Sequence, residues 1–449
     1  MARRLVLVNP SADKLNAISV RQFTLAPPSL AYIAALTPSS WDVKIIDENV
    51  EPITFEDADL VGITAMTWNV VRAYQVSEQF RSKGVKTVIG GIHASMLPDE
   101  AIKFVDSVVI GEAESVWQNL LDDFERGKLK PFYRGARVPL ENLPKPRIDL
   151  FGNKYKIRAS VQTARGCPMD CEFCSVTAFY DRTYRQRPVD EVLDEIESLD
   201  CKEFFFADDN LLNYGEEAEQ RAIRLFKGMY ERGLKKCWMS QVGIDFANNP
   251  EILKWAQKSG CLGVHIGFES ISEESLQGIR KIRNLKVGVR NYRDVISKIH
   301  SHGIGVHGAF VLGNDGDDKD IFERTVEFIL NSKIDTASFT ILTPLPGTRL
   351  YRRLSSEGRL LLTNYPEDWK YYDCERAVFK PKHMTPEELE DGVYRIYQQV
   401  DSRVVSLKRA FNSFAETKKL PVSVVAYSLN RGLGVLATKK YRFERFGAS

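Results

Sequence analysis

The sequence lacks the features of a strongly charged or membrane-spanning protein. Its 62 Lys and Arg residues nearly balance 60 Asp and Glu residues, which leaves a formal net charge of +2. That balance predicts no general affinity for nucleic acid. No run of 18 uncharged apolar residues occurs, so the sequence predicts no membrane-spanning helix. The apolar run near Met1 is too short for a signal peptide and is predicted to be a strand.

Cysteine is also scarce, and its seven residues show no disulfide framework. Four of them are scattered, which fits a reducing cytosol and predicts a cytoplasmic protein. The other three gather in the stretch ARGCPMDCEFCSV: Cys167, Cys171 and Cys174. No fourth ligand is near, because the next cysteine is Cys201 and no histidine lies between His93 and His265.

Three explanations fit such a triplet. Buried structural cysteines rarely cluster so tightly. A structural zinc ion requires four protein ligands, often as two separated pairs, and would indicate a non-catalytic interaction protein. A cluster of four irons needs four outer ligands, so three thiolates would leave one iron open to a small molecule. The missing fourth ligand favours the iron–sulfur cluster.

The first third of the chain alternates short apolar runs with helical stretches. We expect strands at 4–10, 42–49, 60–66, 86–92 and 107–114, and helices at 27–36, 68–83, 97–104 and 114–126. This alternation predicts an α/β fold with a doubly wound parallel sheet, which binds ligands beyond the carboxyl ends of its strands. We place this domain at residues 1–138, and a proline-rich linker at residues 139–154.

The next segment, residues 155–365, repeats the strand–helix unit six times. We expect its strands at 156–163, 203–207, 236–242, 262–267, 304–312 and 335–342. Six such units predict a partial (β/α)6 barrel whose functional groups lie at the carboxyl ends of the strands. The cysteine triplet follows the first strand. The rhythm then stops, and residues 366–449 are predicted to form a mainly helical C-terminal extension.

The spacing Cys-x3-Cys-x2-Cys on the loop after the first barrel strand resembles the signature of radical S-adenosylmethionine (SAM) enzymes. The resemblance implies that Cys167, Cys171 and Cys174 hold a [4Fe–4S] cluster and that SAM chelates the fourth iron. It also implies that the cluster, reduced by a donor such as flavodoxin or ferredoxin, cleaves SAM to a 5′-deoxyadenosyl radical. That radical would abstract hydrogen from a substrate. The motif identifies no residue that acts on the substrate.

The same resemblance places SAM contacts at other strand ends. The stretch FFFADDN carries an acidic pair where the family often has Gly-Gly-Glu, and a solvated turn or helix cap would explain this pair as well. Phe173 is equally explained as a loop aromatic that shields the cluster. Gln241 is equally explained as a structural amide, and His265 and His307 as satisfied core histidines. The expected SAM-binding residues are Phe173, Asp208, Asp209, Asn210, Gln241, Glu269 and Gly313.

A doubly wound domain before such a barrel is similar to cobalamin-binding radical SAM enzymes, over roughly residues 1–365. The stretches GGIHAS and GEAE match that family at sheet edges near the corrinoid. The Asp-x-His-x-x-Gly motif, whose histidine ligates cobalt, is absent, so either cobalt binds without a protein histidine or the domain has lost cobalamin. The expected cobalamin-binding residues are Thr64, Met66, Gly90, Gly91, His93, Gly111, Glu112 and Glu114.

The C-terminal segment is basic. Residues 401–449 hold ten Lys or Arg residues and three acids, a balance of +7. An apolar stretch at 420–436 lies between basic groups that include Lys418, Lys419, Lys439 and Lys440. Such a segment predicts either peripheral contact with an anionic membrane or a solvated basic face beside a packed helix.

These features predict a cobalamin-dependent radical SAM enzyme that methylates an unactivated carbon of a small molecule. The closest likeness is to family members that act on hopanoids and tetrapyrroles. A radical SAM cyclase or oxidoreductase without methyl transfer is the alternative. A zinc-binding interaction protein is the second alternative.

Overall fold

The structure is a computed structural model that describes residues 3–11, 25–213 and 215–446, with side chains described up to residue 435. The chain forms two compact units. The first comprises residues 1–160, 345–351 and 362–373, and the second comprises 161–344, 352–361 and 374–449. The predicted linker at 139–154 therefore lies within the first unit, as do two short segments that follow the last barrel strand.

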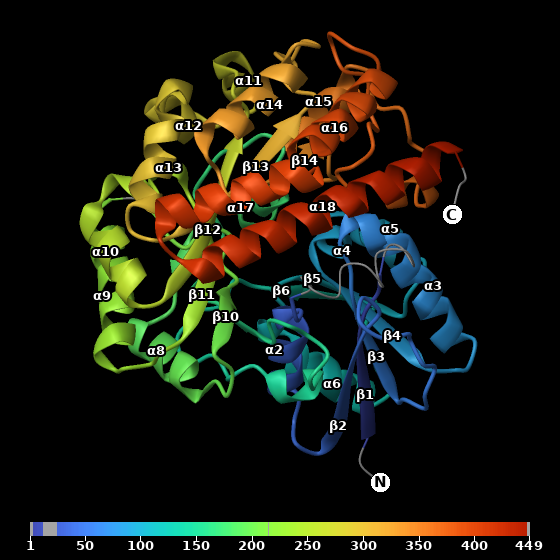
Figure 1. The fold of residues 1–449 in the computed structure, drawn as a ribbon. Coiled ribbons are helices and arrows are strands. Elements are labelled where there is room, and N and C mark those ends of the chain that lie inside the picture. The colour runs from blue at the N-terminus through green and yellow to red at the C-terminus, as the bar shows by residue number, and fades with distance from the viewer. Residues whose placement is uncertain (1–2, 12–24, 214, 447–449) are drawn as a thin grey trace. The chain divides into compact units, whose positions relative to one another are not determined.

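The first unit contains a six-stranded parallel sheet in the order β2-β1-β3-β4-β5-β6 (Figure 1). Its strands are β1 (Arg3–Asn9), β2 (Trp41–Asp47), β3 (Leu60–Thr64), β4 (Lys86–Gly90), β5 (Ser107–Gly111) and β6 (Phe132–Gly135). The chain reverses its direction of winding between β1 and β3, so the doubly wound sheet is confirmed. All five predicted strands are present, whereas β6, only four residues long, was not predicted.

Helices cover both faces of this sheet (Figure 1). They are α2 (Pro28–Leu36), α3 (Val70–Arg81), α4 (Ile92–Met96), α5 (Pro98–Ala101) and α6 (Trp117–Glu125). The core on one face joins side chains of β1 to Leu30 of α2 and Leu120 of α6. The helix expected at 97–104 is present in shorter form as α5, and the short helix α4 that precedes it was not predicted. Pro98 opens a new helix because proline, which lacks an amide hydrogen, is accepted in the first helical turn.

The barrel sheet lies almost entirely in the second unit and has the order β14-β13-β12-β11-β10-β7 (Figure 1). Its strands are β7 (Ala159–Val161), β10 (Glu203–Phe206), β11 (Cys237–Val242), β12 (Cys261–Glu269), β13 (Gly305–Leu312) and β14 (Thr336–Ile341). All six were predicted. The intervening helices are α7 (Ser175–Tyr180), α8 (Val189–Ser198), α9 (Glu216–Glu231), α10 (Pro250–Lys258), α11 (Glu273–Gly278), α12 (Ile282–Val287), α13 (Tyr292–His300) and α14 (Ile321–Ser332).

The C-terminal extension is mainly helical, as predicted. After α15 (Arg349–Ser356) come α16 (Pro386–Val400), α17 (Arg403–Thr417) and α18 (Leu420–Phe446). Thr385 and Glu388 form a reciprocal capping box that fixes the start of α16. Among the helices that the structure describes, none combines the length and hydropathy needed to cross a membrane.

Candidate active site

The cysteine triplet lies on a loop whose two ends are held together. A short antiparallel pair, β8 (Ala164–Arg165) with β9 (Arg185–Gln186), closes the loop. Gly166 follows β8 with a φ of 85°, and a Cβ there would collide with the carbonyl oxygen of Thr183. Only glycine adopts this conformation readily and leaves that space. The backbone immediately before Cys167 is therefore held in a fixed conformation.

The acidic pair at the end of β10 anchors the same segment. Asp208 is buried and accepts hydrogen bonds from the amide of Thr163 at 2.7 Å, its hydroxyl at 2.6 Å and the amide of Ala164 at 3.0 Å. Asp209 accepts one from the amide of Gly166 at 3.2 Å through one carboxylate oxygen. Asn210 accepts one from the amide of Gly243 at 3.1 Å. Asp208 and Asp209, which we expect to bind SAM, thus also hold the backbone that leads into the cysteine loop.

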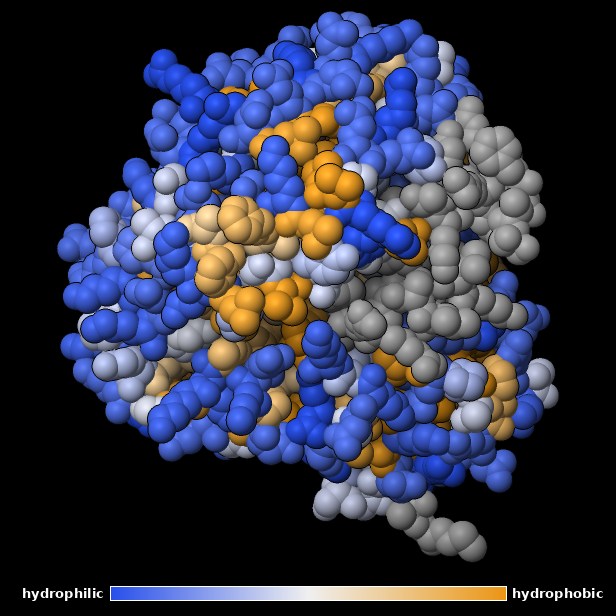
Figure 2. All heavy atoms as spheres, in the orientation of Figure 1, coloured by the Kyte–Doolittle hydropathy of each residue, from blue (hydrophilic) through white to orange (hydrophobic). Residues whose placement is uncertain are grey.

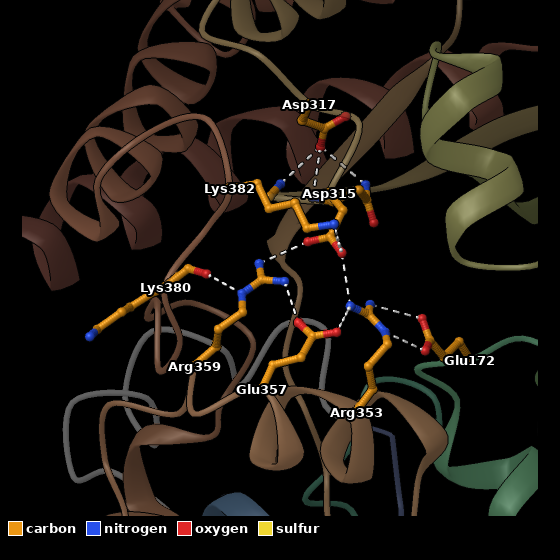
Figure 3. Close-up of polar contacts among 10 residues, drawn as sticks. Glu172, Asp315, Asp317, Arg353, Glu357, Arg359, Lys380 and Lys382 are labelled. Atoms are coloured by element: carbon orange, nitrogen blue, oxygen red, sulfur yellow. Dashed lines mark hydrogen bonds and ion pairs between the residues drawn. The ribbon is translucent and has the colours of Figure 1, made fainter.

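Ion pairs hold the loop between the cysteines (Figure 3). Glu172 receives a bidentate contact from Arg353 at 2.7 and 3.1 Å, and Arg353 also bonds Asp315 at 2.8 Å. Arg359 reaches the other oxygen of Asp315 at 2.8 Å. Asp170 pairs with Arg280 at 2.5 Å. A planar guanidinium that forks onto one carboxylate and bonds a second restrains both, so Arg353 ties the cysteine loop to the turn after β13.

The three thiols suit a cluster better than a single ion. Burial raises the pKa of Cys167 to about 11 and that of Cys171 to about 12, and the neighbouring Cys174 adds to both. Iron bound to these sulfurs would supply the positive charge that keeps them deprotonated. Within the described part of the chain, no three His, Cys, Asp or Glu side chains are arranged to hold one metal ion. Three thiolates that each bind a different iron need not converge on one point, so the donor set fits a [4Fe–4S] cluster.

A buried ion pair stands at the end of β12, beside these thiols. Lys281 donates to Glu269 Oε1 at 2.6 Å. Burial acts to lower the pKa of Lys281, but Glu269 and the thiolates of Cys171 and Cys174 outweigh it and raise that pKa. Gly267 makes room for the pair, because a Cβ there would overlap Glu269 Oε1 and lie 3.0 Å from Lys281 Nζ. The site therefore keeps a cation beside the cluster thiols.

The turn after β13 is shaped by Asp317. Its carboxylate accepts hydrogen bonds from the amides of Gly313 at 3.0 Å and Asn314 at 2.9 Å. Gly313 has a φ of 92°, and a Cβ there would lie 2.5 Å from Leu389. Figure 3 shows this turn next to Asp315 and Arg353. The expected adenine-contacting glycine thus belongs to a rigid turn.

One face of the barrel sheet carries a row of polar side chains. In register across four strands lie Gln241, His265, His307 and Thr336. His307 bonds Thr336 at 2.7 Å and Ser338 at 3.0 Å, as a satisfied core histidine would. The described residues give His265 no hydrogen-bond partner, and Gln241 is exposed. Burial lowers the pKa of both histidines, which keeps them neutral.

In the first unit, three neighbouring strands end in small residues. Thr64 and Gly90 are partners in the register of β3 and β4, and Gly111 ends β5. Gly91 has a φ of 103°, and a Cβ there would overlap the backbone of Ala65. Met66, the next predicted residue, donates its amide to Asn69 at 2.8 Å. Small residues at adjacent strand ends fit the close approach of a flat corrinoid.

His93 is fully buried, and both of its ring nitrogens have partners. Nδ1 lies 3.3 Å from the Thr67 hydroxyl, and Nε2 lies 3.2 Å from Glu100. Trp369 packs on the ring edge-on, with centroids 5.3 Å apart, and donates to Glu100 at 2.9 Å. The imidazole is thus committed to protein contacts rather than offered to a metal.

The remaining predicted residues of this edge support its backbone. A Cβ at Gly111 would lie 2.6 Å from the carbonyl oxygen of Gly135. Glu112 is buried and accepts a hydrogen bond from the amide of Val138 at 3.0 Å. Glu114 lies in the short helical turn that follows.

Sequence reasoning missed Lys281, Arg353 and Glu172. Glu172 sits between two cysteines, so its position was a usable signal. Lys281 and Arg353 lie 12 and 181 residues from their partners, and nothing in a single sequence links such positions.

The sequence matches two protein families. Residues 161–329 match the Radical SAM superfamily, and residues 16–121 match the B12 binding domain. These ranges contain the cysteine triplet and most of the doubly wound sheet, respectively. The motif-based resemblance is therefore confirmed.

Relatives along most of the chain include methyltransferases and a cyclase, the anaerobic magnesium-protoporphyrin IX monomethyl ester cyclase of Rubrivivax gelatinosus, which is 25% identical over 86% of this chain and 73% of that protein. The sequence is 31% identical to the bacteriochlorophyllide d C-12(1)-methyltransferase of Chlorobaculum tepidum, over 91% of this chain and 89% of that protein. It is 26% identical to the hopanoid C-2 methylase of Rhodopseudomonas palustris, over 80% of this chain and 72% of that protein.

A solved structure has the same fold. The radical SAM methyltransferase TsrM of Kitasatospora setae, with cobalamin and a [4Fe–4S] cluster bound, matches 98% of this chain and 100% of its own with a TM-score of 0.69 and 14% identity. The chain belongs to the family of B12-binding radical SAM enzymes, and its cofactors are a [4Fe–4S] cluster, SAM and cobalamin.

Proposed function

We propose that the protein methylates an unactivated carbon of a tetrapyrrole macrocycle. The observation that carries this proposal is the 31% identity to a bacteriochlorophyllide methyltransferase over nearly the whole chain. The polar row of β11–β14 supports it, because a flat macrocycle with polar edges needs hydrogen-bonding groups on an otherwise apolar wall. Neutral His265 packs edge-on against His307 but has no hydrogen-bond partner among the described residues, and it is the group we assign to the substrate.

The chain's own residues divide the work of binding. Cys167, Cys171 and Cys174 would hold the cluster, and Phe173 would pack near the adenine. Asp209, with one carboxylate oxygen bonded only to Gly166, is our candidate for the SAM amino group. Gly313 would lie against the adenine, while Gln241, Glu269 and Asn210 would line the same site. When bound, the three cofactors supply the radical and the methyl group.

Cobalamin would lie on the strand ends of the first unit. We assign its contacts to Thr64, Met66, Gly90, Gly91, Gly111, Glu112 and Glu114. His93 supports the backbone of that edge, since both its nitrogens are engaged. Cobalt would then bind without a protein histidine from this motif.

Two partners complete the proposal. Reduction of the cluster needs a one-electron donor of the flavodoxin or ferredoxin type. The basic extension at 401–449 would meet a membrane surface, where an apolar substrate collects.

The test is product analysis with anaerobically reconstituted protein. The protein is incubated with a reductant, SAM that carries a deuterated methyl group, and either a chlorin or a hopanoid. We expect the chlorin to gain one labelled methyl group, and the His265→Ala variant to raise the KM for the chlorin while substrate-free deoxyadenosine formation stays unchanged. A chlorin product that has lost hydrogen without gaining label would contradict methyl transfer, and a labelled hopanoid alone would contradict the substrate.

A further inference from the structure

We propose that an apolar face of α17 and α18 docks the protein on an anionic membrane surface. This inference deepens the proposed function, on which its membrane contact rests, by assigning that contact to specific side chains. The two helices lie side by side in the second unit (Figure 1).

The hairpin formed by α17 and the start of α18 is firmly attached to the barrel through its inner side. Val422 and Ala426 are buried, and Asn430 donates to the carbonyl oxygen of Asp335 at 2.9 Å. Ser423 donates to the carbonyl oxygen of Ala410 at 2.7 Å and so links the two helices. The opposite side of the hairpin therefore has a fixed orientation toward solvent.

That opposite side is hydrophobic. Eight of the twelve exposed large hydrophobic side chains among the described residues belong to α17 and α18, which excludes a random scatter. On α17 they recur at helical spacing: Val404 is 78%, Leu407 58%, Phe411 71% and Phe414 44% exposed. On α18 they are Leu420, Val424, Tyr427 and Val435. Figure 2 shows the hydrophobic atoms gathered on this face.

The charges around the apolar face have one sign. Arg403, Lys408, Lys418 and Lys419 are exposed. The nearby acids are neutralised, because Asp401 is buried against Arg409 at 3.0 Å and Glu416 pairs with Lys333. Lys439 and Lys440, also predicted to take part, lie outside the residues whose side chains are described. An apolar stripe flanked by free cations matches the interfacial zone of an anionic bilayer.

A second copy of the chain is a poorer occupant. Pairing two such faces would bring eight exposed cations together, and no free carboxylate on the described part of the hairpin would offset them. Like charges brought together in an interface oppose association. Anionic lipid headgroups offer the opposite charge together with an apolar layer, so the charge pattern selects the membrane.

Cosedimentation of the full chain with vesicles tests this docking. The vesicles contain phosphatidylcholine alone or phosphatidylcholine mixed with phosphatidylglycerol. We expect binding to the anionic vesicles that weakens in high salt, because screening shortens the reach of the cations. The double variant Phe411→Ser, Leu420→Ser should lose this binding. The double variant Lys418→Gln, Lys419→Gln should weaken it at least tenfold, since each cation near an anionic surface contributes about fivefold.

Matched variants control for general loss of apolar surface or charge. Leu330→Ser removes an exposed leucine of α14, and Lys254→Gln with Lys258→Gln removes two lysines of α10; all should bind as the wild type does. The proposal would be overturned if the wild type did not bind, or if both double variants bound the anionic vesicles as tightly as the wild type does. A dimer that Phe411→Ser dissociates would assign the face to a second copy instead. Deoxyadenosine formation and methylation of a detergent-dispersed chlorin, measured on the same variants, report separately on the proposed function.

Discussion

Cys167, Cys171 and Cys174 share one loop, although Cys171 is more deeply buried than the other two. We expect each to be needed, because no other cysteine of the chain lies close enough in sequence to replace a lost thiolate. Cys167→Ala, Cys171→Ala and Cys174→Ala should each lose most of the bound iron and all SAM cleavage. Iron content and absorbance of anaerobically prepared protein measure this. Cys201→Ala is the control, since Cys201 lies outside the loop, and it should keep its iron. A triplet variant with full iron would refute the assignment.

Gly267 is small because an ion pair occupies the space where its Cβ would be. Gly267→Ala should displace Glu269 from Lys281 and lower the free energy of unfolding by about 1–3 kcal/mol, the usual cost of overpacking. It should also weaken SAM binding, which calorimetry measures. Gly278→Ala is a matched control, because a Cβ there meets nothing within 4 Å. Equal SAM affinity in the two variants would show that the Glu269–Lys281 ion pair does not contribute to SAM binding.

Asp208 makes stability depend on pH. Burial raises its pKa to about 6, although hydrogen bonds from Thr163 and Ala164 oppose the shift. The folded state therefore keeps a proton that the unfolded chain has released above its ordinary pKa near 4. Stability should fall as pH rises from about 4 to 6, by up to about 3 kcal/mol from this group.

Asp208→Asn preserves the contacts without the titration. Its carbonyl oxygen can accept both backbone amides, and its amide can donate to the Thr163 hydroxyl. Denaturant unfolding at a series of pH values should give a flatter profile for this variant than for the wild type between pH 4 and 6. Parallel profiles would show that Asp208 does not hold the proton.

At the scale of elements, the cysteine loop owes its shape to Arg353 on α15. Arg353→Ala removes a bidentate contact from partly buried Glu172 and should lower the free energy of unfolding by about 1–3 kcal/mol. Cluster iron should also be lost faster to a chelator. Arg353→Lys keeps the charge but not the fork, so it should restore only part of the effect. Arg324→Ala, which removes an exposed arginine of α14, should change neither property.

The strands and the cysteine loop were predictable because their signals are local. Buried parallel strands read as continuous apolar runs, and the triplet lies within eight residues. The start of α5 was readable from Pro98. Contacts such as Lys281–Glu269 and Arg353–Glu172 were not predictable, since they depend on how the barrel brings distant segments together. The exposed face of α17 was missed because apolar periodicity looks the same for a buried and an exposed helix face.

At the scale of the whole molecule, the first unit is built from three separate segments of the chain. Trp369 comes from the last of them and packs on His93. Trp369→Ala should destabilise this unit by about 3–5 kcal/mol, as truncation of a buried tryptophan does. Limited proteolysis should then cut within residues 25–160 sooner than in the wild type. Trp255→Ala, in the second unit, should leave that cleavage rate unchanged.

The interleaving of the two units also sets an order in time. A ribosome that has released residue 160 must still synthesise the barrel before residues 362–373 appear. At ordinary elongation rates this takes roughly 10–40 s. During that interval His93 and Glu100 have no Trp369 to cover them, so the corrinoid-binding unit matures only after most of the barrel has been made. We therefore expect cobalamin to load only after most of the barrel has been synthesised.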